Sequence, residues 1–257
     1  MTGATAQVVV IPLDGGLPAM SVLARQSFPP GADDWTPACE HAWRELLDGN
    51  DRLHDGPIWS VVELSPAALV VRAERYKRLC VQVDSRVGDL GVRVLGVKGL
   101  LTGTDKHGTR RVLIARRGSA TRIYQGLWEL APAGGVDVRA ALSPGALVAT
   151  LRGELREELG EHAAEVVEGV APVFVAAVID PIALSVDVIA QLAWPAVVDP
   201  RAGLCADAAC SWEYVDLAWV SAGDLAAMLA GAPGGEPHAV LSPPTLAVLS
   251  WLGWLKL

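Results

Sequence analysis

The chain has 257 residues, of which 51% are hydrophobic, and its formal net charge is −8. This length suffices for one large domain or for a domain with an N-terminal extension, and the acidic charge argues against a nucleic-acid partner bound through a broad basic surface. No uninterrupted apolar run reaches the roughly 18 residues of a membrane span, so we expect no membrane partner.

Residues 1–90 predict a small α+β subdomain. Val8 to Pro12 is typical of a short strand, and no basic segment followed by a long apolar stretch opens the chain, so a cytoplasmic location is expected. Thr36 to Gly49 predicts a helix, with a threonine cap, a proline in the first turn and a capping box. Ile58 to Leu64 and Leu69 to Ala73 predict a hairpin. We expect this subdomain to supply substrate or dimer contacts, and a homodimer is left open.

A cluster of basic residues follows this hairpin. Its members are Arg72, Arg75, Lys77, Arg78, Arg86 and Arg93. In one interpretation the cluster faces phosphate, which makes Arg75, Lys77 and Arg78 candidate substrate residues. In the other interpretation it is a solvated surface whose charges offset nearby acids.

Residues 91–257 predict a second, larger unit. It begins with two apolar strand candidates, Val94 to Leu101 and Val112 to Ala115, separated by a turn-like segment. Arg116 and Arg117 directly follow the second strand. Because guanidinium groups bind phosphate bidentately, both arginines are candidate substrate residues. Simple exposure at a strand end is the alternative.

The segment Ser143 to Gly160, SPGALVATLRGELREELG, predicts the central helix of the chain. Ser143 suits the N-cap, a proline suits the first helical position and Gly160 suits the residue beyond the end. Four leucines recur at intervals of four residues, which places them in one stripe to be buried. They are Leu147, Leu151, Leu155 and Leu159.

Three glutamates, Glu154, Glu157 and Glu158, fall together on another face of this helix. They lie at the negative end of the helix dipole, and like charges at i and i+4 repel, so the arrangement is unfavourable for stability alone. A divalent cation would remove both penalties, and clustered carboxylate oxygens suit Mg²⁺ or Mn²⁺. A solvated acidic helix end is the alternative.

The remaining elements follow this helix. Val170 to Ile179 and Ala183 to Trp194 predict two long strands, and Glu213 to Val220 predicts a third. Asp224 to Leu229 predicts a short helix, and a final apolar helix is expected from Ser242 to near residue 255.

The cysteine spacing and the motif content exclude several chemistries. Cys39, Cys80, Cys205 and Cys210 are expected to be free thiols, and none of them forms a CxxC motif. The five histidines show no metal-ligand spacing. Because no nucleophile elbow, P-loop or GxGxxG turn occurs, acyl transfer and dinucleotide binding have no basis in the sequence.

Two stretches together resemble the Nudix hydrolase family: GLWELAPAGGVD, from Gly126 to Asp137, and ELREELG, from Glu154 to Gly160. In this resemblance Gly135 matches the opening glycine of the family signature. Glu154 matches the glutamate of its Arg-Glu pair, Glu157 and Glu158 match its Glu-Glu pair, and Gly160 matches its closing glycine.

The chain departs from the signature at several positions. Gly153 occupies the position of the family's arginine and Glu161 that of its closing apolar residue. The loop after Gly135 is longer than usual and lacks the family's glutamate. Since that glutamate and the missing arginine form an ion pair in the family, their joint absence is the loss of one bracing interaction.

The resemblance implies an α/β/α Nudix sandwich with a mixed sheet over residues 91–257, preceded by the subdomain of residues 1–90. It also implies hydrolysis of a nucleoside diphosphate linked to another moiety. Metal ligands would come from Glu154, Glu157, Glu158 and Gly135, with Mg²⁺ or Mn²⁺ as cofactor. A metal-coordinated water attacks phosphorus in such enzymes.

The general base is left open among Glu161, Asp207 and Glu213, with Glu157 and Glu158 also in the catalytic set. The sequence WELAPAGG is similar to Nudix enzymes that act on ADP-ribose and nucleotide sugars. The segment from His54 to Arg78 is similar to Nudix relatives that act on UDP-sugars. We therefore expect an NDP-sugar or ADP-ribose-like small molecule as substrate. Coenzyme A, dinucleotide and prenyl diphosphates are the alternative substrates. The alternative functions are a degenerate Nudix sensor of nucleotides or metabolites and a scaffold role.

Overall fold

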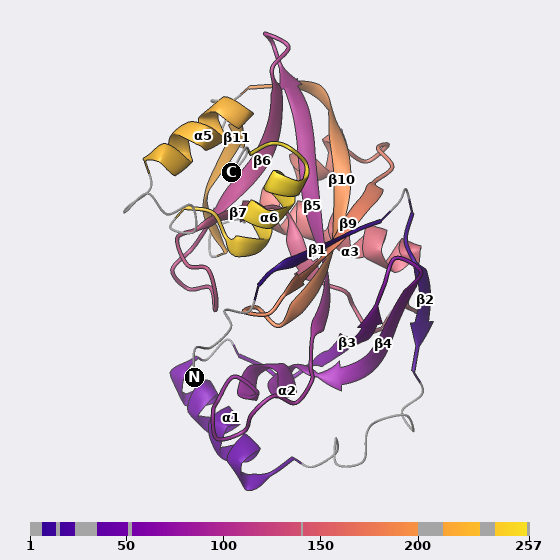
Figure 1. The fold of residues 1–257 in the computed structure, drawn as a ribbon, viewed down its shortest axis with the longest axis vertical. Helices are drawn as coiled ribbons and strands as arrows, with labels where there is room; N and C mark the ends of the chain where they lie inside the picture. Colours follow the sequence, from indigo (N-terminus) through magenta and orange to yellow (C-terminus); the bar gives the residue numbers. More distant parts are fainter. Residues whose placement is uncertain are drawn as a thin grey trace.

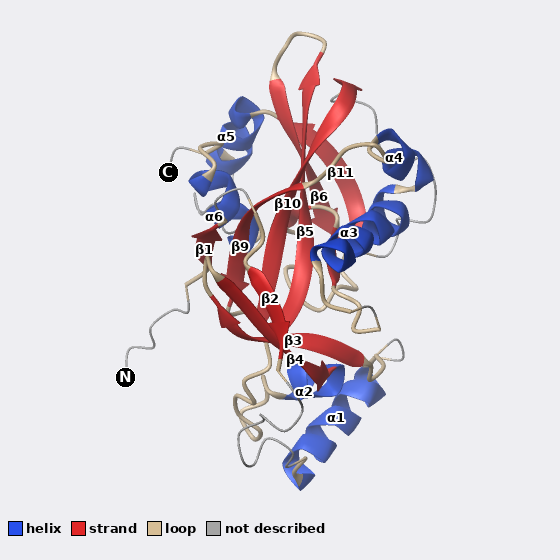
Figure 2. Ribbon diagram, turned by 90° about the vertical axis from the view of Figure 1, so that its right-hand side faces the viewer, coloured by secondary structure: helices blue, strands red, loops and turns tan. Residues whose placement is uncertain are grey.

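The structure is a computed structural model that describes residues 7–13, 16–23, 35–50, 53–139, 141–199, 213–231 and 240–255. In this part of the chain, eleven strands form one mixed sheet with helices on both faces (Figures 1 and 2). The main path of the sheet runs β1-β9-β10-β5-β3-β4-β2, and β6, β7, β8 and β11 branch from it. The α/β class with a mixed sheet, expected from the sequence, is confirmed.

The strands are β1 (Val9–Pro12), β2 (Ala19–Val22), β3 (Pro57–Leu64), β4 (Ala68–Arg75), β5 (Val94–Asp105), β6 (Arg110–Arg117), β7 (Trp128–Leu130), β8 (Ala133–Gly135), β9 (Val173–Asp180), β10 (Ser185–Val198) and β11 (Tyr214–Val220). The helices are α1 (Pro37–Gly49), α2 (Tyr76–Val81), α3 (Pro144–Leu159), α4 (Glu161–Val166), α5 (Ala222–Ala230) and α6 (Pro243–Trp251).

Strand β5 is the element at which the parts of the sheet meet. It runs parallel to β10 along its whole length and antiparallel to β6 at its C-terminal end. Its N-terminal half pairs with β8 and, through the single pair Ser60 and Val94, with β3. The strands β6 and β8, which carry much of the candidate site, are therefore held against different halves of one strand.

Two apolar cores lie on opposite faces of the sheet. The buried residues of α3 and α4 pack with β5, β6 and β10 on one face, and those of α5 and α6 pack with β6, β9 and β10 on the other. A smaller cluster joins α1 to α2 around Trp43 and Val81. Figure 2 shows α3 and α4 on one side of the strands and α5 and α6 on the other.

The long predicted elements are confirmed with small changes at their ends. The predicted hairpin forms as β3 and β4, and α1 begins after Thr36, whose hydroxyl accepts the backbone N–H of Cys39. The expected capping box does not form, because Cys39 rather than Glu40 occupies the third helical position, and Glu40 instead accepts from the Trp35 indole. The last helix ends at Trp251 because Gly253 has a φ of 75°.

Other elements were not predicted, and the division of the chain at residue 90 stays a prediction. The unpredicted elements are β2, α2, β7, β8 and α4, all of which are six residues or shorter. Such short elements carry little periodicity of their own, and the short strands also depend on pairing with distant partners. Among the described residues, no helix is long and apolar enough to cross a membrane.

Candidate functional site

Helix α3 is built as its sequence indicates. Its N-cap residue Ser143 accepts the backbone N–H of Ala146 at 3.2 Å, and Gly160 ends it with a φ of 89°. The leucine stripe is buried in the core against the sheet, with no member more than 2% exposed. This packing fixes the rotation of the helix and therefore the directions in which its three glutamates point.

Glu158 points into the protein and is 5% exposed. Its Oε2 accepts the backbone N–H of Ala133 at 3.0 Å, whereas its Oε1 is buried with no hydrogen-bond partner. Burial, followed by the nearby carboxylates of Glu213 and Glu154, raises the pKa of Glu158 well above its ordinary value. A buried carboxylate oxygen in this state lacks a cation or a proton donor.

Glu154 lies directly over β8. A Cβ built on Gly134 would come within 1.7 Å of Glu154 Oε1, so glycine is needed there for the side chain to lie where it does. Burial raises the pKa of Glu154 to about 7, with further contributions from Glu157 and Glu213. The carboxylates of the helix therefore repel one another at close range.

Glu213 comes from a different part of the chain, immediately before β11. Its carboxylate lies 3.6 Å from the guanidinium of Arg117 at the end of β6. Burial raises the pKa of Glu213, although Arg117 opposes this shift. The structure thus brings Glu154, Glu158, Glu213 and Arg117 together, while Glu157 is the solvent-exposed member of the helix set.

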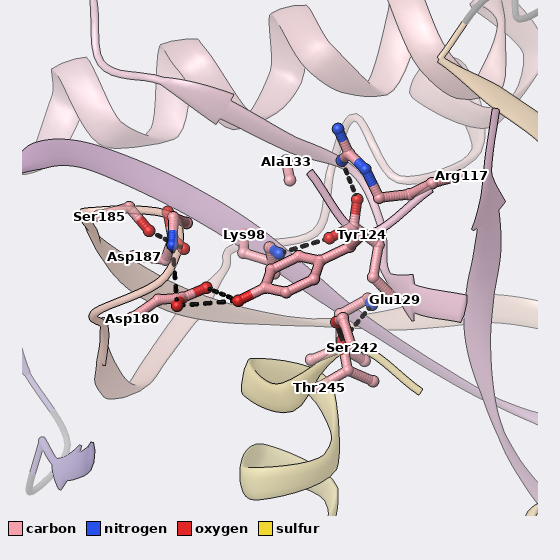
Figure 3. A network of polar contacts seen from close by, with 12 residues as sticks. Lys98, Arg117, Tyr124, Glu129, Ala133, Asp180, Ser185, Asp187, Ser242 and Thr245 are labelled. Atoms are coloured by element: carbon pink, nitrogen blue, oxygen red, sulfur yellow. Dashed lines mark hydrogen bonds and ion pairs between the residues drawn. The ribbon is translucent and has the colours of Figure 1, made fainter. Parts of the chain in front are cut away.

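A buried ionic network adjoins these carboxylates (Figure 3). Glu129, 2% exposed on β7, accepts from Lys98 of β5 at 2.9 Å, from Arg117 and from the hydroxyl of Tyr214 at 3.1 Å. Burial alone would raise the pKa of Glu129, but Lys98 and Arg117 hold it below its ordinary value. Glu129 therefore stays ionised and fixes both cations in place.

The network continues toward the turn between β9 and β10. The hydroxyl of Tyr124 donates to the carboxylate of Asp180 at 2.8 Å, and Asp187 accepts from the hydroxyl of Ser185 at 3.0 Å. Asp187 lies over Gly96, where a Cβ would approach its carboxylate to 2.2 Å. Burial raises the pKa of Asp187, an effect that Lys98 opposes.

Of the two strand-end arginines, only Arg117 reaches this site. Arg116 alternates to the other face of β6, where it lies 5.9 Å from the centre of the Trp128 ring and 3.9 Å from Asp216. The two candidates, adjacent in sequence, are therefore separated by the pleat of the strand.

The three basic candidates of the N-terminal segment have partners of their own. Arg75 pairs with Asp55 at 2.5 Å, and Lys77 lies 4.2 Å from the centre of the Trp35 ring. Arg78 is buried and lies 3.2 Å from Glu74. None of these contacts includes a residue of the carboxylate group.

The remaining predicted residues lie at the edges of the site or outside the described residues. Glu161 opens α4 and pairs with Arg156 at 3.3 Å on the surface. Gly135 is exposed, and it is the adjacent Ala133 and Gly134 that contact the glutamates. Asp207 lies outside the described residues, as do Cys205, Cys210 and His238.

The donor set fits a divalent cation whose remaining positions are filled by other ligands. In the described part of the chain, no three His, Cys, Asp or Glu side chains already form a group that could hold a metal ion. However, Glu158 Oε1 is buried and has no hydrogen-bond partner, Glu213 raises the pKa of both Glu154 and Glu158, and Glu154 raises the pKa of Glu158. Mg²⁺ is commonly bound by one or two carboxylates together with waters and substrate phosphates, which matches this open arrangement.

Several residues of the site were missed by the sequence analysis. Lys98 and Asp187 each lie as a charge among apolar neighbours in a strand, which is a usable signal because a buried charge needs a partner. Glu129 lies inside the quoted WELAPAGG stretch without an assigned role. Tyr124 and Tyr214 carried no signal that separates them from packing residues.

The chain is similar to several solved structures at low sequence identity. No protein-family profile matches the chain, and no curated protein matches its sequence. Among solved structures, the NUDIX domain of Shewanella oneidensis NrtR complexed with ADP ribose is similar, with 19% identity and a TM-score of 0.41 over 66% of this chain and 91% of that chain.

Two further structures share this likeness. The Nudix hydrolase RenU from M. smegmatis is 19% identical with a TM-score of 0.37 over 63% of this chain and 84% of its own. A MutT protein from Methanosarcina mazei is 19% identical with a TM-score of 0.32 over 53% of this chain and 82% of its own. The first two of these structures are described as Nudix proteins and the third as a MutT protein.

Proposed function

We propose that the chain is a metal-dependent hydrolase that cleaves a nucleoside diphosphate linked to another moiety. The products are a nucleoside monophosphate and a phosphorylated compound, and the substrate is an NDP-sugar or an ADP-ribose-like molecule. The observation that supports this most strongly is the meeting of Glu154, Glu158, Glu213 and Arg117 around a buried carboxylate oxygen that has no partner. The resemblance of the surrounding motif to Nudix hydrolases points to the same chemistry.

In this proposal Glu154, Glu157 and Glu158 would hold Mg²⁺ or Mn²⁺, since both cations prefer oxygen ligands. When bound, the divalent ion neutralises the diphosphate and lowers the pKa of the attacking water. The protein's own contribution is to hold the carboxylates close enough together that Glu157 raises the pKa of Glu154, and Glu154 raises the pKa of Glu158. The N–H of Ala133 fixes one oxygen of Glu158 and leaves the other available.

Glu213 is the proposed general base. It takes the proton of the attacking water at a carboxylate oxygen, and its raised pKa brings it closer to the working pH of a base. Arg117 lies 3.6 Å away and orients it. Glu161 is less well placed, because its carboxylate pairs with Arg156 on the surface.

Arg117 and Lys98 are the proposed positive groups beneath the diphosphate. Both are bound to Glu129, so their positions are set before a substrate arrives. A preorganised cation stabilises charge that develops on phosphoryl oxygens without a reorganisation cost at the moment of reaction. Arg117 also contacts Glu213, so it links the base to this network.

The test is a panel of ADP-ribose, UDP-sugars, coenzyme A, dinucleotides, prenyl diphosphates and nucleoside triphosphates with Mg²⁺ or Mn²⁺. Products are read by phosphate release after added phosphatase. We expect turnover of the sugar-linked nucleoside diphosphates, and turnover of triphosphates or non-nucleotide diphosphates alone contradicts this substrate class. For the base, Glu213→Gln should remove the acidic limb of the pH–rate profile and Glu161→Gln should retain it.

A second candidate function is a sensor that binds such a compound without cleaving it. Two departures from the family signature favour it: Gly153 replaces the bracing arginine, and the loop after β8 has no glutamate. The same panel separates the two functions, because a sensor raises its melting temperature with one compound while releasing no phosphate.

A further inference from the structure

A pocket of about 820 Å³ lies apart from the carboxylates, at the junction of the α1–α2 unit with the loop between β6 and β7. Its walls come from α1, from the segment 53–58, from α2, from residues 120–125 and from Ile182 in the β9–β10 turn. Figure 1 shows α1 and α2 together at one end of the molecule, away from α5 and α6. The pocket therefore joins the N-terminal elements α1 and α2 to the loop before β7 and to the β9–β10 turn, which are distant from one another in sequence.

The described lining of this pocket is mainly apolar and has no acidic group, although Asn50, His54, Thr121 and Gln125 add polar side chains. Leu46, Val83 and Ile182 are 37%, 62% and 51% exposed, although residues of this kind are usually buried. Tyr76 adds an aromatic ring to the wall. The described lining residues include no Asp or Glu, although the chain has a net charge of −8. They include one arginine, Arg122.

The loop that forms one wall of the pocket also contacts the candidate active site. The Nε of Arg117 donates to the carbonyl of Ile123 at 3.0 Å, and Ile123 lines the pocket. The next residue, Tyr124, has a φ of 56° and donates to Asp180 on the opposite side of the loop. One short segment therefore separates the pocket from the arginine that faces Glu213 and Glu129.

We propose that this pocket receives the nucleoside of the substrate, with its base against Tyr76, Val83 and Ile182 and its phosphate near Arg122. This proposal rests on the proposed function, since it assigns the part of the substrate that the carboxylates do not hold. A mainly apolar, carboxylate-free wall with an arginine beside it suits a planar group joined to an anion. Aromatic stacking against a base is also independent of which base is present.

The test measures binding and turnover separately in the full-length protein. Binding of UMP and AMP is measured by calorimetry without metal, so that hydrolysis plays no part. Ile182→Asp places a carboxylate in the apolar wall, and we expect it to weaken mononucleotide binding by about tenfold or more. The matched control is Val197→Asp, a change at the far end of β10 that is 67% exposed and outside the pocket, which should leave binding unchanged.

Two further readouts assign the orientation. Arg122→Gln should weaken binding of UMP and AMP while leaving uridine and adenosine unaffected, because only the phosphate meets the guanidinium. With metal present, Ile182→Asp should raise the KM for a sugar-linked nucleoside diphosphate and leave kcat near that of Val197→Asp.

The outcomes distinguish this proposal from the proposed function. If the wild type hydrolyses the substrates and Ile182→Asp matches Val197→Asp in both Kd and KM, the pocket assignment is overturned while the hydrolase stands. If nothing is hydrolysed but Ile182→Asp still abolishes mononucleotide binding, the pocket stands and the hydrolase fails. If no mononucleotide binds and only non-nucleoside diphosphates turn over, the assignment of a nucleoside to the pocket is wrong.

Discussion

Glu158 is the residue at which stability and the proposed function conflict. It is almost fully buried, one of its oxygens has no partner, and Glu213 and Glu154 repel its charge. Burial of a carboxylate under these conditions costs free energy unless a cation compensates. Nothing in the packing of α3 requires an acid here, because the leucine stripe alone provides the apolar contact.

We therefore predict that Glu158→Gln raises the melting temperature of the metal-free protein at neutral pH. The amide keeps an oxygen for the N–H of Ala133 and removes a carboxyl group whose ionisation burial opposes. Each 1 kcal/mol gained corresponds to roughly 2 to 4 °C in a chain of this size. Glu161→Gln, at an exposed position, is the control and should leave the melting temperature unchanged; a lower melting temperature for Glu158→Gln speaks against a strained carboxylate.

The raised pKa of Glu154 predicts a pH dependence of stability. The folded protein holds this proton up to about pH 7, whereas the unfolded chain releases it near its ordinary pKa of 4.5. The resulting stabilisation is complete below pH 4.5 and is lost as pH rises through 7, so the metal-free melting temperature should fall between pH 5 and pH 8.

Two comparisons check this assignment. Glu154→Gln should reduce the slope of melting temperature against pH, since it removes one of the titrating groups. Mn²⁺ should raise the melting temperature more at pH 8 than at pH 5, because cations bind the deprotonated carboxylates. A slope that is identical in wild type and variant would exclude Glu154 as the source.

At the scale of elements, helix α3 and strand β8 form the framework of the site. The sequence predicts the helix well because its cap, its leucine spacing and its terminal glycine are local signals that agree with one another. It does not predict β8, three residues long, whose position is set by pairing with β5. The close approach of Gly134 to Glu154 is therefore visible only in the structure, whereas the motif singles out the neighbouring Gly135.

Two adjacent glycines give a matched test of this framework. Gly134→Ala places a methyl group where the carboxylate of Glu154 lies, so the side chain must move. We predict a loss of about ten- to a hundredfold in metal affinity, the range seen when groups that support a metal ligand are changed. Gly135→Ala meets no atom within 4 Å and should bind metal as the wild type does. Equal affinity of both variants, measured by Mn²⁺ titration, contradicts a positioning role for Gly134.

At the scale of the whole molecule, the site depends on contacts that join distant parts of the chain. Glu129 on β7 binds Lys98 of β5, Arg117 of β6 and Tyr214 of β11, and the last pair is separated by 85 residues. Periodicity indicates which strands are buried but gives neither their order in the sheet nor their register. The sequence makes Arg116 and Arg117 equal candidates for substrate binding. In the structure only Arg117 reaches the site, because alternate residues of β6 face opposite sides of the sheet.

This long-range assembly also separates the basic residues into two groups. Arg117 and Lys98 face the carboxylates, while Arg75, Lys77 and Arg78 pair with acids and an aromatic ring of the N-terminal segment. The N-terminal basic cluster therefore contributes to the junction of α1, α2 and β4, and its part in substrate binding stays a proposal. The pocket lined by Tyr76 and Ile182 lies beside this cluster, and its wall is the surface through which the N-terminal residues would influence specificity.

The central claim is that the acidic face of α3 is a catalytic metal site, and the most direct test is metal-dependent hydrolysis of ADP-ribose by wild type and Glu158→Gln measured side by side. The account predicts turnover that requires Mg²⁺ or Mn²⁺, that ceases with EDTA and that falls by orders of magnitude in the variant, with the circular dichroism spectrum unchanged. Equal turnover by the variant, or turnover by the wild type that persists in EDTA, would contradict it.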